Sequence, residues 1–256
     1  MWRAADYFLW IAGRWRERIR LGTIAEERAR AAGFERYQAH ALFDSIAETE
    51  WHRRWDVHDA EPLLTQAASI YSALGDFKGA SKVEYYRSRL YRRGRRLPES
   101  LMIARRAIEL AQRAGDRVAE ALGHHALGNA FASQRQFDAA REAYHVALPV
   151  FAEADQEMEA VARRALGQVA LEEGDYRTAL IELETAFDRF VELEAYVEAA
   201  EAGLYHAVVL ASLGEIDEAR AELGNMADAL DRLGSVVRRR DVESARRRID
   251  SLAESC

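Results

Sequence analysis

The sequence holds little proline and cysteine, and it has no long apolar run. Its 256 residues include three prolines and a single cysteine, Cys256. Proline removes a backbone donor and clashes with the preceding helical turn, so a chain this poor in it can be helical nearly throughout. One cysteine excludes an intramolecular disulfide, which suits a reducing compartment. No run approaches the roughly 18 apolar residues that span a bilayer, so we expect a soluble, cytoplasmic protein.

Motifs that announce catalysis, nucleotide binding or a metal site are also missing. The sequence has no Gly-x-x-x-x-Gly-Lys-Ser/Thr loop, no Gly-x-Gly-x-x-Gly turn and no Gly-x-Ser-x-Gly elbow. His124 and His125 are adjacent on an expected helix and point about 100° apart, so both cannot readily bind one zinc ion. We therefore predict a protein that is not an enzyme and has no cofactor and no metal site.

Lysine is scarce and acidic charge is unevenly spread. Only Lys78 and Lys82 among the 36 basic residues are lysines. Residues 1–116 carry 21 basic and 16 acidic side chains, a net charge of +5, whereas residues 117–256 carry 15 and 27, a net charge of −12. Such an asymmetry can steer partners or orient neighbouring copies of the chain.

Glycines recur in two interleaved series with a period near 40 residues. Glycine is favoured just past a helix end because it alone adopts the left-handed backbone conformation cheaply. Two series at one period therefore predict two helices per repeat. The first series runs through Gly33, Gly75, Gly115 and Gly234, with Asp155 and Ala195 at the intervening steps, and the second through Gly13, Gly94, Gly174 and Gly214.

Apolar residues follow the same period. Ala140, Tyr144 and Ala147 are spaced i, i+4, i+7, which places them on one face of a helix. A last helix at 237–254 carries Val242, Ala245, Ile249 and Leu252 on one stripe, which predicts a cap over the final repeat. The other expected helices are 2–12, 15–32, 35–53, 58–74, 78–93, 98–114, 117–134, 137–154, 157–173, 176–194, 197–213 and 216–233.

Two stretches carry a family resemblance. The segments 127–131 and 137–148 resemble a tetratricopeptide repeat, and so do Leu166-Gly167 and 174–180. The spacing near 40 is similar to repeats in kinesin light chains and in bacterial regulators and signalling ATPases that end in helical sensor arrays.

The resemblance implies an all-α, right-handed α-solenoid of about six helix-turn-helix repeats plus the C-terminal capping helix. This solenoid would form a single domain over 1–256, with the clearest repeats in 117–234 and divergent ones in 1–116.

The resemblance also implies a concave groove, lined by the first helix of each repeat, that binds a peptide or a protein partner. Asn129 stands where peptide-binding members often carry asparagine, but His125 replaces the lysine expected one turn earlier and the later lysine is replaced near Glu201. A free acidic C-terminus is therefore a doubtful ligand. The inward positions are Glu84, Ser88, Tyr91, His125, Asn129, Ser133, Arg164, Gln168 and Glu172.

The function we favour is an interaction scaffold or adaptor. The alternative is a regulatory sensor array that controls a signalling ATPase or a transcription factor. Direct nucleic-acid binding is a third reading, based on the clusters 92–96, 238–240 and 246–248, because arginines near aromatic residues can contact phosphates and bases. The net charge of −7 argues against it.

All five tryptophans lie early in the chain, between positions 2 and 55. Large aromatic residues at an uncapped end of a repeat array leave apolar surface that needs a neighbour. We therefore expect Trp2, Trp10 and Trp15 to mark an end interface, with another copy of the chain, another subunit or a further domain as the partner.

Overall fold

The computed structural model describes residues 2–11, 14–47, 57–232 and 239–254. Within these ranges every regular element is a helix and none is a strand, so the predicted all-α fold is confirmed. No described helix combines the length and the apolarity that crossing a membrane requires. The helices are α1 Trp2–Ile11, α2 Trp15–Ala31, α3 Glu35–His40, η1 Ala41–Ala47, α5 Val57–Ala73, α6 Phe77–Arg93, α7 Leu97–Ala114, α8 Arg117–Ser133, α9 Phe137–Ala154, α10 Gln156–Glu173, α11 Tyr176–Glu192, α12 Tyr196–Ser212, α13 Ile216–Arg232 and α14 Arg239–Ala253.

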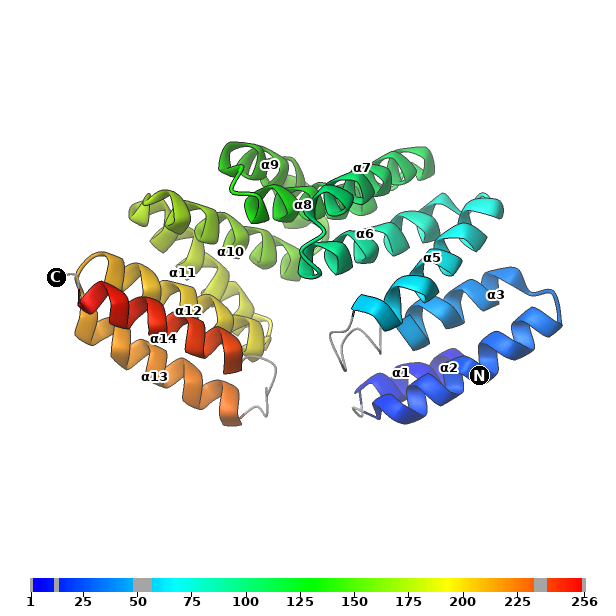
Figure 1. The fold of residues 1–256 in the computed structure, drawn as a ribbon, viewed down its shortest axis with the longest axis horizontal. Helices are drawn as coiled ribbons and strands as arrows, with labels where there is room; N and C mark the ends of the chain where they lie inside the picture. The colour runs from blue at the N-terminus through cyan, green and yellow to red at the C-terminus, as the bar shows by residue number, and fades with distance from the viewer. Residues whose placement is uncertain (1, 12–13, 48–56, 233–238, 255–256) are drawn as a thin grey trace. The chain divides into compact units, whose positions relative to one another are not determined.

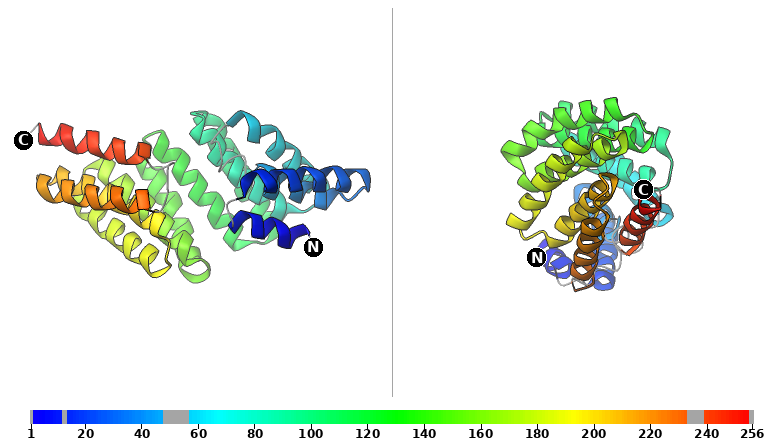
Figure 2. Two further views of the ribbon diagram at one scale, coloured as in Figure 1. Left: turned by 90° about the horizontal axis from the view of Figure 1, so that it is seen from below. Right: turned by 90° about the vertical axis from the view of Figure 1, so that its left-hand side faces the viewer.

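The chain divides into two compact units, residues 1–136 (unit 1) and residues 137–256 (unit 2). Within each unit, consecutive helices pack against one another, as in a stack of helix pairs (Figure 1). In unit 2, α12, α13 and α14 run side by side (Figure 2). The single continuous array over 1–256 stays a prediction.

A repeated Gly-Asp pair explains where several helices end and begin. Gly75, Gly115 and Gly174 adopt a left-handed backbone that ends one helix. The aspartate that follows each of them caps the next helix, because its carboxylate accepts a hydrogen bond from the backbone N–H three residues later, at 3.0–3.2 Å. Asp155 makes the same cap without a preceding glycine.

The turns correct the predicted glycine series at three places. Gly94 has a φ of −72°, and the left-handed residue of that turn is Arg95, with a φ of 60°. The later step falls on Glu194, with a φ of 56°, and not on Ala195. Asp155 is extended, because α10 begins directly after α9 ends and leaves no room for a left-handed residue. Gly13 and Gly234 lie outside the described residues.

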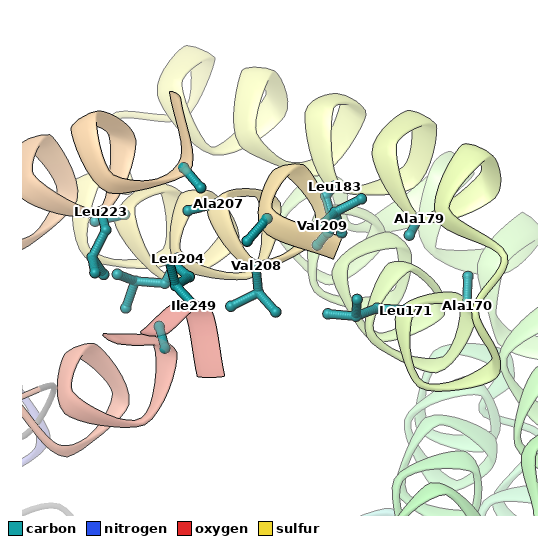
Figure 3. Close-up of a cluster of buried hydrophobic side chains, with 14 of the residues drawn as sticks. Ala170, Leu171, Ala179, Leu183, Leu204, Ala207, Val208, Val209, Leu223 and Ile249 are labelled. Atoms are coloured by element: carbon teal, nitrogen blue, oxygen red, sulfur yellow. The ribbon is translucent and has the colours of Figure 1, made fainter. Parts of the chain in front are cut away.

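The end of unit 2 is closed as predicted. Ile249 of α14 is buried against Leu204 and Val208 of α12, in a cluster that also holds Leu223 of α13 (Figure 3). Val242 and Leu252 are partly buried against the same cluster. Burying one isoleucine stabilises the contact by roughly 1.5–3 kcal/mol, so α14 acts as a cap over the exposed face of the last helix pair.

The predicted helix 35–53 is wound differently from expectation. It begins as α3, but from Ala41 the chain continues as the π-helix η1. A π-helix closes its hydrogen bonds over five residues, so it rotates the following side chains away from their α-helical directions. Residues 48–53 of the prediction lie outside the described ranges.

Candidate functional site

Unit 1 contains a pocket of about 510 Å³ on the face formed by three first helices, α3 with η1, α6 and α8. Tyr71 of α5, the second helix of its pair, also reaches the pocket. The pocket therefore lies where the resemblance placed a binding groove, although different side chains form it. Its lining residues are His40, Phe43, Asp44, Tyr71, Asp76, Lys78, Gly79, Ser81, Lys82, Tyr85, Asp116, Val118, Ala119 and Leu122.

Buried aromatic rings form the walls. Phe43, Tyr71 and Tyr85 are each almost fully buried. Tyr86, behind the wall, packs edge-to-face on Phe43 at 5.1 Å and on Tyr85 at 5.4 Å between ring centroids. Such edge-to-face pairs fix the orientation of the rings, so the walls are set before any ligand arrives.

A chain of polar contacts crosses one side of the pocket. The Tyr71 hydroxyl lies 2.8 Å from Nδ1 of His40, and the same nitrogen lies 3.3 Å from Asp44. Nζ of Lys82 lies 3.4 Å from the other oxygen of Asp44 and 4.9 Å from the centre of the Phe43 ring. Burial raises the pKa of Asp44, but the hydrogen bond with His40 and the charge of Lys82 outweigh it, so the pKa is held below its usual value. Asp44 is therefore a carboxylate at neutral pH.

A second ion pair joins two of the three helices. Nζ of Lys78 on α6 lies 2.7 Å from Asp116, the residue that caps α8. The hydrogen bond raises the pKa of Lys78, and together with the bond from the backbone N–H of Ala119 it lowers the pKa of Asp116. Both lysines thus face a carboxylate, and the pocket presents apolar walls with a charge-balanced rim.

The predicted inward residues of α6 are turned away from the pocket. Ser88 is 1% exposed, and its hydroxyl donates to the Ser100 carbonyl of α7 at 2.9 Å. Glu84 is buried beside Arg87 and Arg106, and burial raises its pKa. These two side chains fix α6 to its neighbours, so the expectation that they line an open groove is wrong.

Tyr91 is buried as well. Its hydroxyl donates to Glu61 of α5 at 2.8 Å, and burial raises its pKa. The pocket side of α6 carries Lys78, Lys82 and Tyr85, spaced i, i+4, i+7. This stripe lies one residue, about 100°, away from the predicted one.

The predicted residues of α8 continue the stripe of Val118 and Leu122 but do not reach the pocket. His125 is buried, and Asn129 lies 3.3 Å from its ring. Ser133 is exposed and donates to the Asn129 carbonyl at 2.9 Å. On this helix the predicted direction agrees with the pocket face, and the pocket uses only the first two turns.

The predicted residues Arg164, Gln168 and Glu172 belong to unit 2. Arg164 pairs with Glu201 of α12, and Glu172 pairs with Arg248 of α14. Gln168 is half-buried. The two charged residues hold neighbouring helices together within their unit. The nine predicted groove residues thus fall into two units, six in unit 1 and three in unit 2.

The remaining predicted sites divide by what the structure describes. The side chains of Trp2, Trp10 and Trp15 lie outside the described residues, so the end interface stays a prediction. In the cluster 92–96, Arg96 binds Glu61 and Glu99 and stacks on a tyrosine ring at 4.4 Å. Residues 238–240 are not described at the side-chain level. Among the described residues, no group of three His, Cys, Asp or Glu side chains could hold a metal ion.

The sequence did contain a signal for the pocket. Lys78 and Lys82 are its only lysines, they stand one helical turn apart, and Tyr85 follows on the same stripe. The contributions of Phe43 and Asp44 had no comparable signal, because their direction depends on the π-helical winding of η1.

No protein-family model matches the sequence, and no curated protein matches it. Among solved structures the chain is similar to BtubC from P. vanneervenii, with 18% identity over 86% of this chain and 92% of that one, at a TM-score of 0.70. It is similar to a Rap protein complexed with Competence and Sporulation Factor, with 17% identity over 98% and 73% of the two chains, at a TM-score of 0.72.

A third similar structure is a signal transduction ATPase with numerous domains that carries a tetratricopeptide repeat sensor, from Pyrococcus horikoshii. The identity is 17% over 89% of this chain and 35% of that chain, at a TM-score of 0.68. At such identities the likeness concerns the fold. The protein has the tetratricopeptide-type helical-repeat fold, in agreement with the resemblance in its sequence.

Proposed function

We propose that this protein is an interaction scaffold that binds an extended peptide or a partner segment through the pocket of unit 1. The observation that carries the proposal is the pocket itself, about 510 Å³ on the face of three first helices. Ligand sites in proteins are typically concave, with apolar walls and a few placed polar groups. The pocket of unit 1 has this composition.

The occupant that suits the pocket is an apolar side chain carried by a polar backbone. Phe43, Tyr85 and Leu122 offer it apolar surface. The ion pairs Lys78–Asp116 and Lys82–Asp44 give a rim without excess charge of either sign, so a charged side chain gains little there. Backbone N–H and C=O groups of an extended peptide can bond to both members of each pair.

The test is a selection of peptides from a random library on the full chain, followed by affinity measurements on a filled pocket. Ala119→Phe places a ring in the pocket, because Ala119 lines it from the third position of α8. Ala139→Phe is the matched control, at the third position of α9 and half-buried in unit 2. We expect Ala119→Phe to weaken binding at least tenfold and the control to bind as wild type. Peptides that bind both variants equally would refute the pocket as their site.

A regulatory sensor array is the second candidate function. It is supported by the likeness to the sensor-bearing ATPase, of which this chain spans 35%. In this reading the pocket ligand would control an effector domain or a partner ATPase. Co-purification of the tagged chain from its source cells, with and without a selected peptide, separates the two. An ATPase or transcription factor whose recovery changes with the peptide supports regulation, and an unchanged set of partners supports a scaffold.

A further inference from the structure

A second concave surface of unit 1 lies at the corner where α2 turns into α3. Its floor is formed by Ala25, Ala29 and Ala32, and its wall by Phe34 and Tyr37, around a volume of about 560 Å³. The two rings pack edge-to-face at 6.3 Å, and yet they are 59% and 58% exposed. Large aromatic surface left in water at a groove is typical of an interaction site. We call these five residues with Arg28 the corner groove.

Arg28 gives the corner groove a positive rim. It is exposed and has no ion-pair partner within the described part of the chain, unlike Arg30, which pairs with Glu26, and Arg36, which pairs with Asp76. Unit 1 as a whole carries 23 basic and 17 acidic residues, a net charge of +6. The groove therefore suits an apolar segment that also carries a carboxylate.

Unit 2 presents a segment of that kind at the turn from α11 to α12. Val191, Leu193 and Tyr196 are 41%, 37% and 50% exposed there. Glu194 stands between the last two, in the left-handed conformation that forms the turn. We call these four residues with Glu198 the acidic corner.

The negative charge of the acidic corner is not neutralised locally. Glu194 and Glu198 have no cationic partner among the side chains that the structure describes. Glu157 on α10 has its pKa raised by burial and by the charges of Glu198 and Asp155. Unit 2 carries 13 basic and 26 acidic residues, a net charge of −13. A nearby cation would relieve this repulsion.

We propose that copies of this chain associate head to tail, with the acidic corner of one copy seated in the corner groove of the next. Leu193 and Tyr196 would cover the rings of Phe34 and Tyr37, and Glu194 would pair with Arg28. The two surfaces match in apolar character and oppose in charge, and every copy carries both. A contact between two different surfaces leaves one of each free at the ends of an assembly, so its size grows with concentration.

Sedimentation velocity of the full chain over a hundredfold range of concentration tests this proposal. We expect the average sedimentation coefficient to rise with concentration at about 0.1 M salt. The rise should shrink at about 1 M salt, where the screening length falls from roughly 10 Å to 3 Å. A monomer at every concentration would overturn the proposal. So would a size that exceeds a monomer and never changes with concentration.

Charge reversal identifies the surfaces. Arg28→Glu and Glu194→Arg should each weaken association at least tenfold, and an equimolar mixture of the two variants should restore it, because each variant supplies the partner that the other needs. Arg105→Glu is the matched control, an exposed arginine of α7 outside both surfaces, and should associate as wild type. Thermal melts check that all variants fold. Association that Arg105→Glu weakens equally, or that the mixture does not restore, would show a different interface.

Discussion

The two units share helix length and spacing but hold their helices together differently. Of the ten fully buried polar or charged side chains among the described residues, eight lie in unit 1 and two in unit 2. Unit 1 joins helices through contacts such as Ser88–Ser100 and Tyr91–Glu61. The center of unit 2 is apolar, with Phe190 among its fully buried side chains.

The difference shows that one backbone pattern tolerates two kinds of packing. A buried polar group costs little when it is hydrogen-bonded and much when it is not. The hydroxyl pair of Ser88 and Ser100 is satisfied from both sides, so α6 and α7 approach closely without large apolar side chains. The pocket occurs in this polar unit, where aromatic rings and ion pairs meet at one face.

The largest expected effect comes from removing a ring in unit 2. Phe190→Ala should lower the free energy of unfolding by about 3–5 kcal/mol, through lost burial and a cavity. All five tryptophans belong to unit 1, so tryptophan fluorescence follows that unit alone while circular dichroism follows both. We expect urea melts in which the dichroism transition moves and the fluorescence transition stays.

The same experiment sharpens the comparison whichever way it falls. Phe190→Leu, which keeps most of the buried volume, is the control and should shift the transition far less. If fluorescence and dichroism shift together, the units unfold as one. That outcome would favour the single array over 1–256 that the sequence predicts.

An intermediate effect is expected where glycines let two helices approach. A methyl group added at Gly123 in unit 1 would lie 2.6 Å from Cγ1 and 3.1 Å from the backbone N of Ile108. Gly123→Ala should therefore destabilise by about 1–3 kcal/mol. At Gly203 in unit 2 the nearest atom is the sulfur of Met226, at 2.5 Å, on a flexible side chain. Gly203→Ala should be close to neutral, because better helix propensity, about 1 kcal/mol, offsets the adjustment.

Thermal or urea melts of the two alanine variants measure this difference directly. Equal losses in both variants would show that Met226 is as rigid as the Ile108 backbone. The contrast drawn between the units would then fail at this contact.

The smallest effect is a pH dependence of opposite sign in the two units. His206 in unit 2 lies 2.8 Å from Glu222 and 3.5 Å from Glu184, and the hydrogen bond with Glu222 raises its pKa. Its contribution to stability is thus full below the unfolded value of about 6.5 and is lost as pH rises through the folded value. Burial lowers the pKa of His124 in unit 1. His124 therefore costs stability as pH falls below about 6.5, because the unfolded chain takes up a proton that the folded chain resists.

Stability measured from about pH 5.5 to 8.5 separates the two histidines. His206→Gln should lose more stability at the acidic end than at the basic end. His124→Gln should gain relative to wild type at the acidic end. The same sign for both variants would contradict the stated environments.

The sequence located the helices closely and the site only in part. The expected range 157–173 corresponds to α10 at Gln156–Glu173, and 137–154 corresponds to α9 without change. These limits are local, because an aspartate caps the helix that follows it and glycine ends the helix before it. The groove face was correct for α8 and wrong for α6. One residue rotates a helical side chain by about 100°, so a small error in facing exchanges a pocket residue for a buried one.

The sequence by itself determined that this chain is all helix, that its helices pair with a period near 40 residues and that a last helix covers the end of the stack. Those properties follow from caps, turn residues and apolar spacing within one or two helices. Only the tertiary structure decided that Phe43, Lys82 and Leu122 line one pocket and that Ser88 is buried. Side chains some 80 residues apart meet through the packing angles of several helices and the π-helical winding of η1, and no local pattern encodes either.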